Sequence, residues 1–429
     1  MNGTNSSSPD NINSMNTSDA VNALSKRGRN SLPQEICEYI LEYFFKTKII
    51  ACGGSHTIIL TKDGTLFACG SNDHGQLGLG DTTHRNTFTK VPALPDGKVA
   101  KQVVAGLEHT MILAEDGTVF ACGHNLYGQL GLGDDESLNT FTAVPPFPEG
   151  VVVAQIVAGD LHTMICAQDG TVFACGYNSY GELGLGDYDY RNYFTAVTTL
   201  PKGVVIKQVI AGSNHTMILA KDGRVFACGD NSNGQLGLGH EEQMITFTAV
   251  PTLPDGKVAT QVSAGEFHTM ILTEDGTVFA CGSNYHGQLG LGDYKDRNTF
   301  TTVPALPDGK VAVQLISGKF HTMIIAQDGT VFACGRNDEG QLGLGHNDDR
   351  FTLTAVPSLP DGKVASQVVG GYEHTMILAV DGTVFACGRN NQGQLGLGNN
   401  THRITFTPVN TLPEGVVVAQ IVAGDLHTM

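Results

Sequence analysis

The chain has 429 residues, of which 54 are glycine, and this is nearly double the ordinary glycine usage. Because glycine destabilises helix interiors, such a content excludes a helical bundle as the main architecture. The formal net charge of −17 argues against nucleic acid as the main partner, since an acidic surface repels the phosphate backbone. Hydrophobic residues make up 41% of the chain, which is enough for a folded core.

No apolar run approaches the length that a membrane-spanning helix needs, and the first 30 residues lack the apolar core of a signal peptide. We therefore expect a protein of the cytoplasm or the nucleus that works without a membrane. Delivery into a host cell is the alternative if the protein is microbial.

Residues 1–30 are rich in asparagine and serine and contain few apolar residues, which predicts a disordered tail. Residues 31–47 differ, because Ser31 suits a helix cap and Pro33 suits a first helical turn. The apolar residues of this second segment recur at helical spacing and form one face: Ile36, Ile40, Leu41 and Phe44.

This amphipathic helix at residues 31–47 has two interpretations. The segment resembles the first helix of an F-box, and that resemblance implies a ubiquitin-ligase adaptor as a partner. The alternative, which we favour, is a helix that packs across the domain that follows, because amphipathic helices usually face a core.

From residue 49 onward the sequence repeats with a period of 53 residues. The tripeptide Ala-Cys-Gly occurs seven times at this spacing. Self-similarity at a fixed period of this size indicates a solenoid, a propeller or an array. The dipeptide His-Thr marks each period: His56, His109, His162, His215, His268, His321, His374 and His427.

One period reads as four short strands, which in the second unit are Phe88–Val91, Val103–Gly106, His109–Ala114 and Thr118–Gly123. Each is rich in β-branched or aromatic residues and is bounded by turn residues such as Asp-Gly. We therefore predict an all-β, seven-bladed propeller of four-stranded antiparallel blades over residues 49–429.

The sequence does not decide which segments at the two ends of the repeat region close the ring. The first unit, Ile49–Gly70, lacks a preceding Phe-Thr strand, and Thr405–Val409 can supply that strand from the other end of the chain. Residues 416–429 then remain as a surplus partial repeat. An eighth partial blade and a truncated chain are the alternatives.

The run AGLEHTMILAEDGTVFACGHNLYGQLGLGD at residues 105–134 and its copies resemble the regulator-of-chromosome-condensation repeat family. The resemblance covers residues 49–429 and implies a seven-bladed propeller. That family often has tryptophan where this chain has the cysteine of Ala-Cys-Gly. Since the chain contains no tryptophan, we expect no resemblance to the tryptophan-dependent plant ultraviolet-B photoreceptor of the family.

The residues with chemical potential all favour structural roles. No Cys-x-x-Cys pair is present for a zinc cluster, and one cysteine per blade is too far from the next for a disulfide. The repeated histidines are expected to make the same hydrogen bond in every blade. The Gly-Gln-Leu-Gly-Leu-Gly loops lack the following helix of a phosphate site, and Asp187-Tyr-Asp189 lacks the glycine of a calcium loop. We predict no metal, no cofactor and no catalytic residue.

The variable positions of the repeat predict a binding face. Along a blade, successive turns alternate between the two faces of the disc, so the uniform Pro-Asp-Gly and Asp-Gly turns share one face. The two residues before each His-Thr share the opposite face with the loops that begin Asn-x-x-Gly, and these positions vary freely. Because loops on a rigid scaffold carry function, we predict that the opposite face binds a partner protein.

Tyrosine and arginine, which anchor many protein interfaces, gather on this face. Units two and three add acidic residues and tyrosines, whereas units six and seven add lysine and arginine. For any single residue the alternative is a solvated loop position without a role. The residues predicted to bind a partner are Glu108, Tyr127, Asp160, Tyr180, Asp187, Glu266, Phe267, Lys319, Phe320, Arg336, Tyr372, Glu373 and Arg389.

The family resemblance implies a small GTPase as the partner, because the best-known member promotes guanine-nucleotide exchange on Ran. Such exchange needs no covalent chemistry, only tighter binding of the nucleotide-free GTPase. The Ran exchange factor carries an insertion within one blade, whereas all repeats here keep the 53-residue spacing. Binding without exchange is therefore one alternative. A substrate receptor or assembly scaffold, linked to a ubiquitin ligase through residues 31–47, is another.

Overall fold

The computed structural model describes residues 52–410, 412 and 418–425. They belong to one compact unit of the chain, which spans Ile49–Met429. The predicted tail over residues 1–30 and the predicted helix over residues 31–47 lie outside the described residues. The adaptor contact inferred from that helix therefore stays a prediction.

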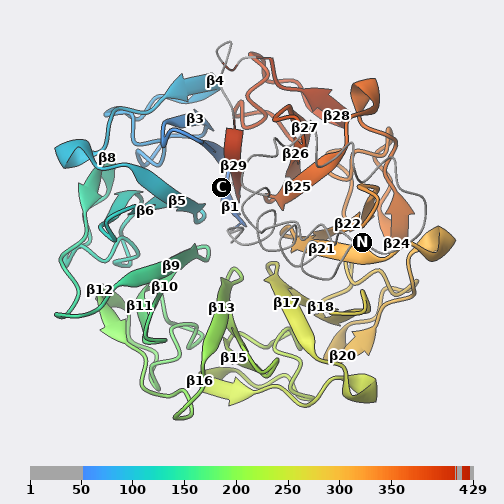
Figure 1. The fold of residues 1–429 in the computed structure, drawn as a ribbon, viewed down its shortest axis with the longest axis horizontal. Helices are drawn as coiled ribbons and strands as arrows, with labels where there is room; N and C mark the ends of the chain where they lie inside the picture. Colours follow the sequence, from blue (N-terminus) through green and yellow to red (C-terminus); the bar gives the residue numbers. More distant parts are fainter. Residues whose placement is uncertain (1–51, 411, 413–417, 426–429) are drawn as a thin grey trace, which may run out of the picture. The chain divides into compact units, whose positions relative to one another are not determined.

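Seven sheets are arranged in a ring around a central axis (Figure 1). Six sheets have four strands, and the sheet that contains β2 has five. The prediction of a seven-bladed propeller with four-stranded antiparallel blades is confirmed. We number the blades 1 to 7 in the chain order of the strands that begin with the repeated histidine.

In blades 2 to 7 the chain runs from the strand nearest the axis to the strand at the rim (Figure 1). The inner strands of blades 2 to 7 are β5 (Ala100–Ala105), β9 (Val153–Ala158), β13 (Ile206–Ala211), β17 (Ala259–Ala264), β21 (Ala312–Ser317) and β25 (Ala365–Gly370). The second strands, which begin with the repeated histidine, are β2 (His56–Thr61), β6 (His109–Ala114), β10 (His162–Ala167), β14 (His215–Ala220), β18 (His268–Thr273), β22 (His321–Ala326) and β26 (His374–Ala379).

The third strands end in Ala-Cys-Gly and are β3 (Leu66–Gly70), β7 (Val119–Gly123), β11 (Val172–Gly176), β15 (Val225–Gly229), β19 (Val278–Gly282), β23 (Val331–Gly335) and β27 (Val384–Gly388). The rim strands are β4 (Arg85–Lys90), β8 (Leu138–Ala143), β12 (Arg191–Ala196), β16 (Met244–Ala249), β20 (Arg297–Thr302), β24 (Arg350–Ala355) and β28 (Arg403–Pro408). Two further strands, β1 (Cys52–Gly54) and β29 (Val418–Asp425), belong to blade 1.

Short 3-10 turns occupy all four Pro-Asp-Gly connectors: η2 (Pro95–Gly97), η3 (Pro254–Gly256), η4 (Pro307–Gly309) and η5 (Pro360–Gly362). The aspartate of each turn has a positive φ, for example 56° at Asp96. Aspartate tolerates this left-handed conformation better than most residues, which suits it to the turn. Over the part of the chain that the structure describes, no helix is long and apolar enough to cross a bilayer.

The repeat unit begins one strand later than predicted. The prediction that Phe88–Val91 opens the second blade is wrong, because β4 pairs with β3 and forms the rim of blade 1. The long loop between these strands is folded compactly by Asn72. Its Nδ2 donates to the backbone oxygen of Asp81 (2.8 Å), and its Oδ1 accepts from the backbone N–H of Leu77 (2.9 Å).

The ring is closed within blade 1 by the C-terminal strand. β29 pairs antiparallel with β2, in the position that β5 takes beside β6, and β1 pairs parallel with β29. Two predictions about closure are therefore wrong. The segment Thr405–Val409 forms the rim of blade 7 and does not close blade 1, since β28 pairs with β27. Within the segment 416–429 that was predicted as a surplus repeat, the described residues 418–425 form β29 and complete blade 1.

The hydrophobic core lies between neighbouring blades rather than at one centre. Phe120 of blade 2 packs in one cluster with Ile58 and Leu77 of blade 1. At the closing boundary, Phe67 of blade 1 packs with Met376 of blade 7. Full burial of one such side chain stabilises the fold by roughly 1.5–3 kcal/mol. Each of these clusters therefore stabilises two neighbouring blades at once.

Ion pairs confirm that the two uniform turns share a face. The lysine after Pro-Asp-Gly pairs with the aspartate of the Asp-Gly turn: Lys98–Asp116 (2.5 Å), Lys257–Asp275, Lys310–Asp328 (2.7 Å) and Lys363–Asp381 (2.6 Å). We call this side the constant face. The variable face is the opposite side, which carries the residues before each repeated histidine and the long loops between the third strands and the rim strands.

Candidate binding face

The repeated histidines link the seven blades into a closed belt. Nε2 of each histidine lies beside the hydroxyl of the repeated threonine in the next blade, from His56 and Thr110 (2.9 Å) round to His374 and Thr57 (3.4 Å). Each threonine hydroxyl in turn donates to a backbone oxygen of the preceding blade, as Thr110 does to Gln76 (2.7 Å). Because the hydroxyl proton is used there, the histidine donates its Nε2 proton to the threonine.

Burial keeps the belt histidines neutral. Desolvation lowers the pKa of His374 to about 4. The same burial lowers the pKa of six others to about 3: His56, His109, His162, His215, His268 and His321. For these six, Nδ1 has no hydrogen-bond partner among the described residues. The prediction that each repeated histidine makes the same structural hydrogen bond is confirmed for the seven described histidines, and His427 lies outside the described residues.

The repeated cysteines are buried thiols at the same blade boundaries. Sγ of Cys122 lies 3.6 Å from the backbone oxygen of Gln76, the acceptor that the threonine of the belt also uses. The seven repeated cysteines, together with Cys166, are buried and free. Desolvation raises the pKa of the thiols, for Cys334 to about 12, so they pack as small apolar groups.

Blade 3 differs from the other six blades at Glu182, a position next to the belt. The other six blades have glutamine there, and its side-chain oxygen accepts a backbone N–H, as Gln129 does from Tyr127 (3.1 Å). Glu182 accepts the same bond from Tyr180 through Oε2 (2.9 Å), but its Oε1 has no hydrogen-bond partner in the described residues. The side chain is fully buried, and desolvation raises the pKa of the carboxyl to about 8.

We expect Glu182→Gln to stabilise the protein above pH 4.5. The folded-state pKa of about 8 exceeds the ordinary value of 4.5, so ionisation of Glu182 costs stability progressively as the pH rises from 4.5 to 8. Glutamine removes this cost, which gives roughly 4 kcal/mol at pH 8 and almost nothing below pH 4.5. Urea unfolding of both proteins at the two pH values measures the difference, and equal stability at pH 8 would contradict the expectation.

The long loops of the variable face contain an internal brace. Asn178 donates through Nδ2 to the backbone oxygen of Asp187 (2.9 Å), and the Asp187 carboxylate pairs with Arg191 (2.6 Å). The same aspartate–arginine pair recurs in blades 1 and 5: Asp81–Arg85 and Asp293–Arg297. Asp187 is thus held within its own loop in the same way as Asp81 and Asp293. Its role in partner binding stays a prediction.

Five predicted residues of blades 5 to 7 meet in one group, which we call the aromatic–lysine cluster. Nζ of Lys319 lies 3.0 Å from the Glu266 carboxylate and 3.7 Å from the centre of the Tyr372 ring. The Phe320 ring contacts the rings of Phe267 and Tyr372, with centroid separations of 6.2 and 5.6 Å. Ion pairing and cation–π contact hold the lysine in one orientation over the aromatic rings.

The predicted arginines of blades 6 and 7 surround a buried carboxylate. Glu373 is only 4% exposed, and it pairs with Arg336 (2.7 Å) and with Arg389. Arg336 also pairs with Asp338 (2.6 Å). The positive charge predicted for these blades is therefore balanced by neighbouring acids, and the arginines hold the loops together.

The tyrosines of blades 2 and 3 form a second group, the tyrosine cluster. The Tyr127 ring lies 5.0 Å from the Tyr177 ring and 5.3 Å from the Tyr190 ring, both edge to face. The Tyr180 ring lies 6.2 Å from that of Tyr177. Two of the four, Tyr127 and Tyr180, are predicted binding residues, and Tyr190 is 47% exposed.

The two remaining predicted residues adjoin the groups already described. Asp160 lines one small pocket of the variable face together with Glu266, Lys319 and Tyr372 of the aromatic–lysine cluster. Glu108 lies beside the tyrosine cluster: its Oε2 is 3.3 Å from Nε2 of His74, and the nearby His124 ring lies 6.1 Å from the Tyr127 ring.

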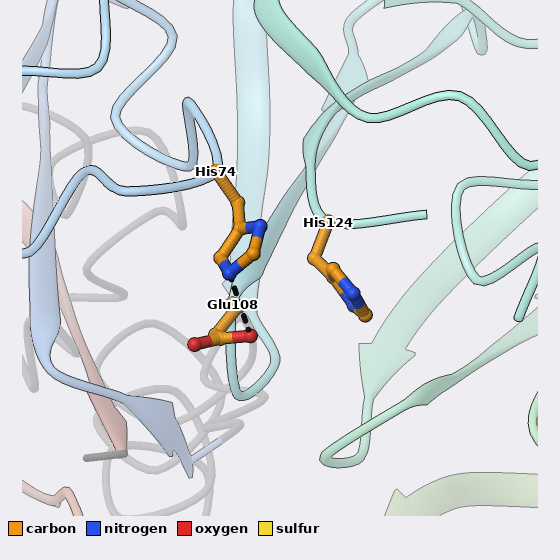
Figure 2. Close-up of side chains that lie close together, drawn as sticks. All are labelled: His74, Glu108 and His124. Carbon is orange, nitrogen blue, oxygen red and sulfur yellow. Dashed lines mark ion pairs between the residues drawn. The ribbon is translucent and has the colours of Figure 1, made fainter. Parts of the chain in front are cut away.

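Glu108 has two histidine neighbours that the sequence prediction missed (Figure 2). The rings of His74 and His124 have centroids 4.7 Å apart, and one ligand atom from each of the three residues lies within 4.8 Å of the others. His74 and Glu108 are 34 positions apart, the same separation as Gln76 and Thr110 of the belt. The sequence separation identifies His74 and Glu108 as neighbours only after the structure has shown that residues 34 positions apart meet between blades.

Two exposed apolar residues of the long loops were also missed. Leu126 is 61% exposed and Tyr285 is 77% exposed. They occupy the position after the loop asparagine, where the other five blades have Asp73, Ser179, Ser232, Asp338 and Asn391. An apolar residue at an otherwise polar position is the signal that identifies them.

Comparison with known proteins identifies related propellers. A model described as the RCC1-like domain matches residues 23–315. A model of the regulator of chromosome condensation (RCC1) repeat matches residues 328–378 and 381–429. Among solved structures, Prp20p from Saccharomyces cerevisiae, described with its binding properties to Gsp1p and histones, has a TM-score of 0.71 at 25% identity. That match covers 82% of this chain and 87% of Prp20p.

Two curated relatives have higher identity. The chain is 33% identical over 360 residues to the ultraviolet-B receptor UVR8 of Arabidopsis thaliana, which covers 83% of the chain and 80% of the receptor. It is 32% identical over 290 residues to a secretion-regulating guanine nucleotide exchange factor of Bos taurus, which covers 65% of the chain and 61% of that protein. The expectation that missing tryptophan removes any resemblance to the ultraviolet-B receptor is therefore wrong.

Proposed function

Because the chain belongs to the family of RCC1-like domains, we propose that it is a protein-binding propeller whose variable face engages a small GTPase of the Ran type. The observation that carries the proposal is the contrast between the two faces: a frame repeated in every blade holds loops whose exposed side chains differ. The similarity to a guanine nucleotide exchange factor supports a GTPase as the partner.

Leu126 and Tyr285 are the side chains that we assign as anchors. They are the most exposed large apolar side chains of the described residues, and both lie in braced loops. Apolar and aromatic residues on rigid loops lose little entropy on binding, so they contribute most of the affinity in many interfaces.

We expect the double substitution Leu126→Ser, Tyr285→Ser to weaken binding to a Ran-type GTPase at least tenfold, because it removes both apolar anchors. Serine already occupies this position in blades 3 and 4, so the loops accept it. Val258→Ser is the matched control, since Val258 is a 55% exposed apolar residue on the constant face. Biolayer interferometry measures both affinities, and equal losses in the two proteins would contradict the assignment.

Nucleotide exchange is the more specific form of this proposal. A propeller that binds the nucleotide-free GTPase more tightly than the loaded form promotes release without a covalent step. Release of fluorescent nucleotide from a panel of Ran-type GTPases tests it. Faster release that the double substitution abolishes supports exchange, and binding without faster release limits the function to binding. No binding to any GTPase of the panel would overturn the proposal in favour of an assembly scaffold.

A further inference from the structure

We propose that His74, Glu108 and His124 form a site for a zinc-type divalent metal ion at the junction of blades 1 and 2 (Figure 2). His74 lies in the long loop of blade 1, Glu108 lies just before β6, and His124 follows β7. Nε2 of His74 is 3.3 Å from Oε2 of Glu108. Ligand atoms bound to tetrahedral zinc lie roughly 3.4 Å apart, so this pair already has the spacing of two ligands.

The third ligand needs only a small movement. One nitrogen of His124 lies within 4.8 Å of the other two ligand atoms, so a side-chain shift of at most roughly 1.5 Å brings it to metal-binding distance. Two imidazoles and one carboxylate are the donor set that suits zinc and other late transition metals, whereas calcium and magnesium require more oxygen ligands. His74 is 36% exposed, so water or a partner side chain can reach the fourth position.

The internal repeat shows that this donor set is specific to one junction. The same three positions at the junction of blades 5 and 6 hold His286, Phe320 and Arg336. There the histidine pairs with a single carboxylate, since Nδ1 of His286 lies 3.0 Å from Oδ2 of Asp349. The frame is identical at both junctions, so the donors at blades 1 and 2 arise from substitutions at variable positions.

Gln129 provides a way to strengthen the site. Its Nε2 lies 2.7 Å from Nδ1 of His124, because its Oε1 accepts from the backbone N–H of Tyr127. Nδ1 of His124 is therefore an acceptor held by Gln129, and we assign Nε2 as the metal ligand. In this tautomer Nε2 carries the proton, which opposes metal binding. A glutamate at position 129 reverses this when it is ionised, because its carboxylate accepts from Nδ1–H and leaves the lone pair of Nε2 for the metal. Burial raises the pKa of the equivalent Glu182 to about 8, but at position 129 the imidazole N–H and the metal charge favour the ionised form.

The test is titration of the full chain with zinc chloride at pH 7.5, by calorimetry and by thermal unfolding. We expect one zinc per chain that depends on the three residues. Glu108→Gln and His124→Gln should each weaken this binding at least tenfold, whereas the matched His286→Gln should leave it unchanged. Gln129→Glu should tighten it. Zinc should raise the unfolding temperature of the unsubstituted chain more than that of Glu108→Gln.

Circular dichroism checks that each variant remains folded. Tighter zinc binding by Gln129→Glu cannot result from unfolding, so that result does not depend on this check. Equal zinc affinity and stoichiometry in the unsubstituted chain, Glu108→Gln and His124→Gln would overturn the proposal. So would a loss with His286→Gln as large as with His124→Gln, or equal binding of magnesium. The outcome is independent of GTPase binding, because the site and its measurement involve no partner.

Discussion

A chain that ends at Asn410 does not form a closed propeller, because blade 1 then lacks β29, the strand that pairs with the inner edge of β2. β29 supplies five register pairs to β2 and the pairing partner of β1. Without it the inner edge of β2 is unpaired, and the core between blades 7 and 1 loses Val418. We expect a loss of at least ~5 kcal/mol, which is comparable to the whole stability of many domains.

Urea unfolding followed by far-ultraviolet circular dichroism measures this loss. The matched control is a chain that ends at Asp425, since it retains the whole of β29. We expect the control to unfold cooperatively near the midpoint of the full chain. A chain ending at Asn410 with the same midpoint would contradict closure by β29.

Acidification below pH 6.5 should unfold the protein steeply. In the fold the pKa of six belt histidines is about 3, below the ordinary 6.5, so the unfolded chain binds more protons between these values. The free energy of unfolding therefore falls as the pH falls from 6.5 towards 3. Each histidine contributes a loss of roughly 2 kcal/mol at pH 5, and together they approach the ~5–15 kcal/mol stability of a domain. Glu182 acts in the opposite sense, but as a single group.

The variant His162→Gln, His215→Gln tests the origin of this pH dependence. Glutamine keeps a donor for the threonine but does not titrate. The variant should be less stable at pH 7 and should lose less stability between pH 7 and pH 5 than the unsubstituted chain. Urea unfolding at both pH values measures the two losses, and equal losses would show that the belt histidines are not the titrating groups.

The blade number follows from the sequence because every unit repeats the same histidine and cysteine at one spacing. The residue at which each blade begins does not follow from the sequence, because a periodic sequence can be divided into equal units at any point. The short connector from Phe88–Val91 to the next strand suggests one blade, but Asn72 folds the longer loop before it just as tightly. Closure has the same difficulty, since residues 418–425 fit the inner strand of any blade.

The binding face follows from the sequence because turns alternate between faces, but the contacts on it do not. The side chains that meet there come from different blades, as with Lys319 and Glu266 or His74 and Glu108. Burial is also hidden in the sequence: Glu373 reads as a surface acid, yet it is enclosed by two arginines. Such contacts depend on how neighbouring blades are positioned against each other, and this is known only from the structure of the whole ring.

Hydrogen–deuterium exchange of the full chain, alone and with a bound Ran-type GTPase, tests most directly which side of the ring docks the partner. Slower exchange in the loops of residues 124–137 and 283–296, with unchanged exchange in the Pro-Asp-Gly connectors, is the predicted result. Slower exchange confined to the connectors would place the partner on the constant face and contradict the account.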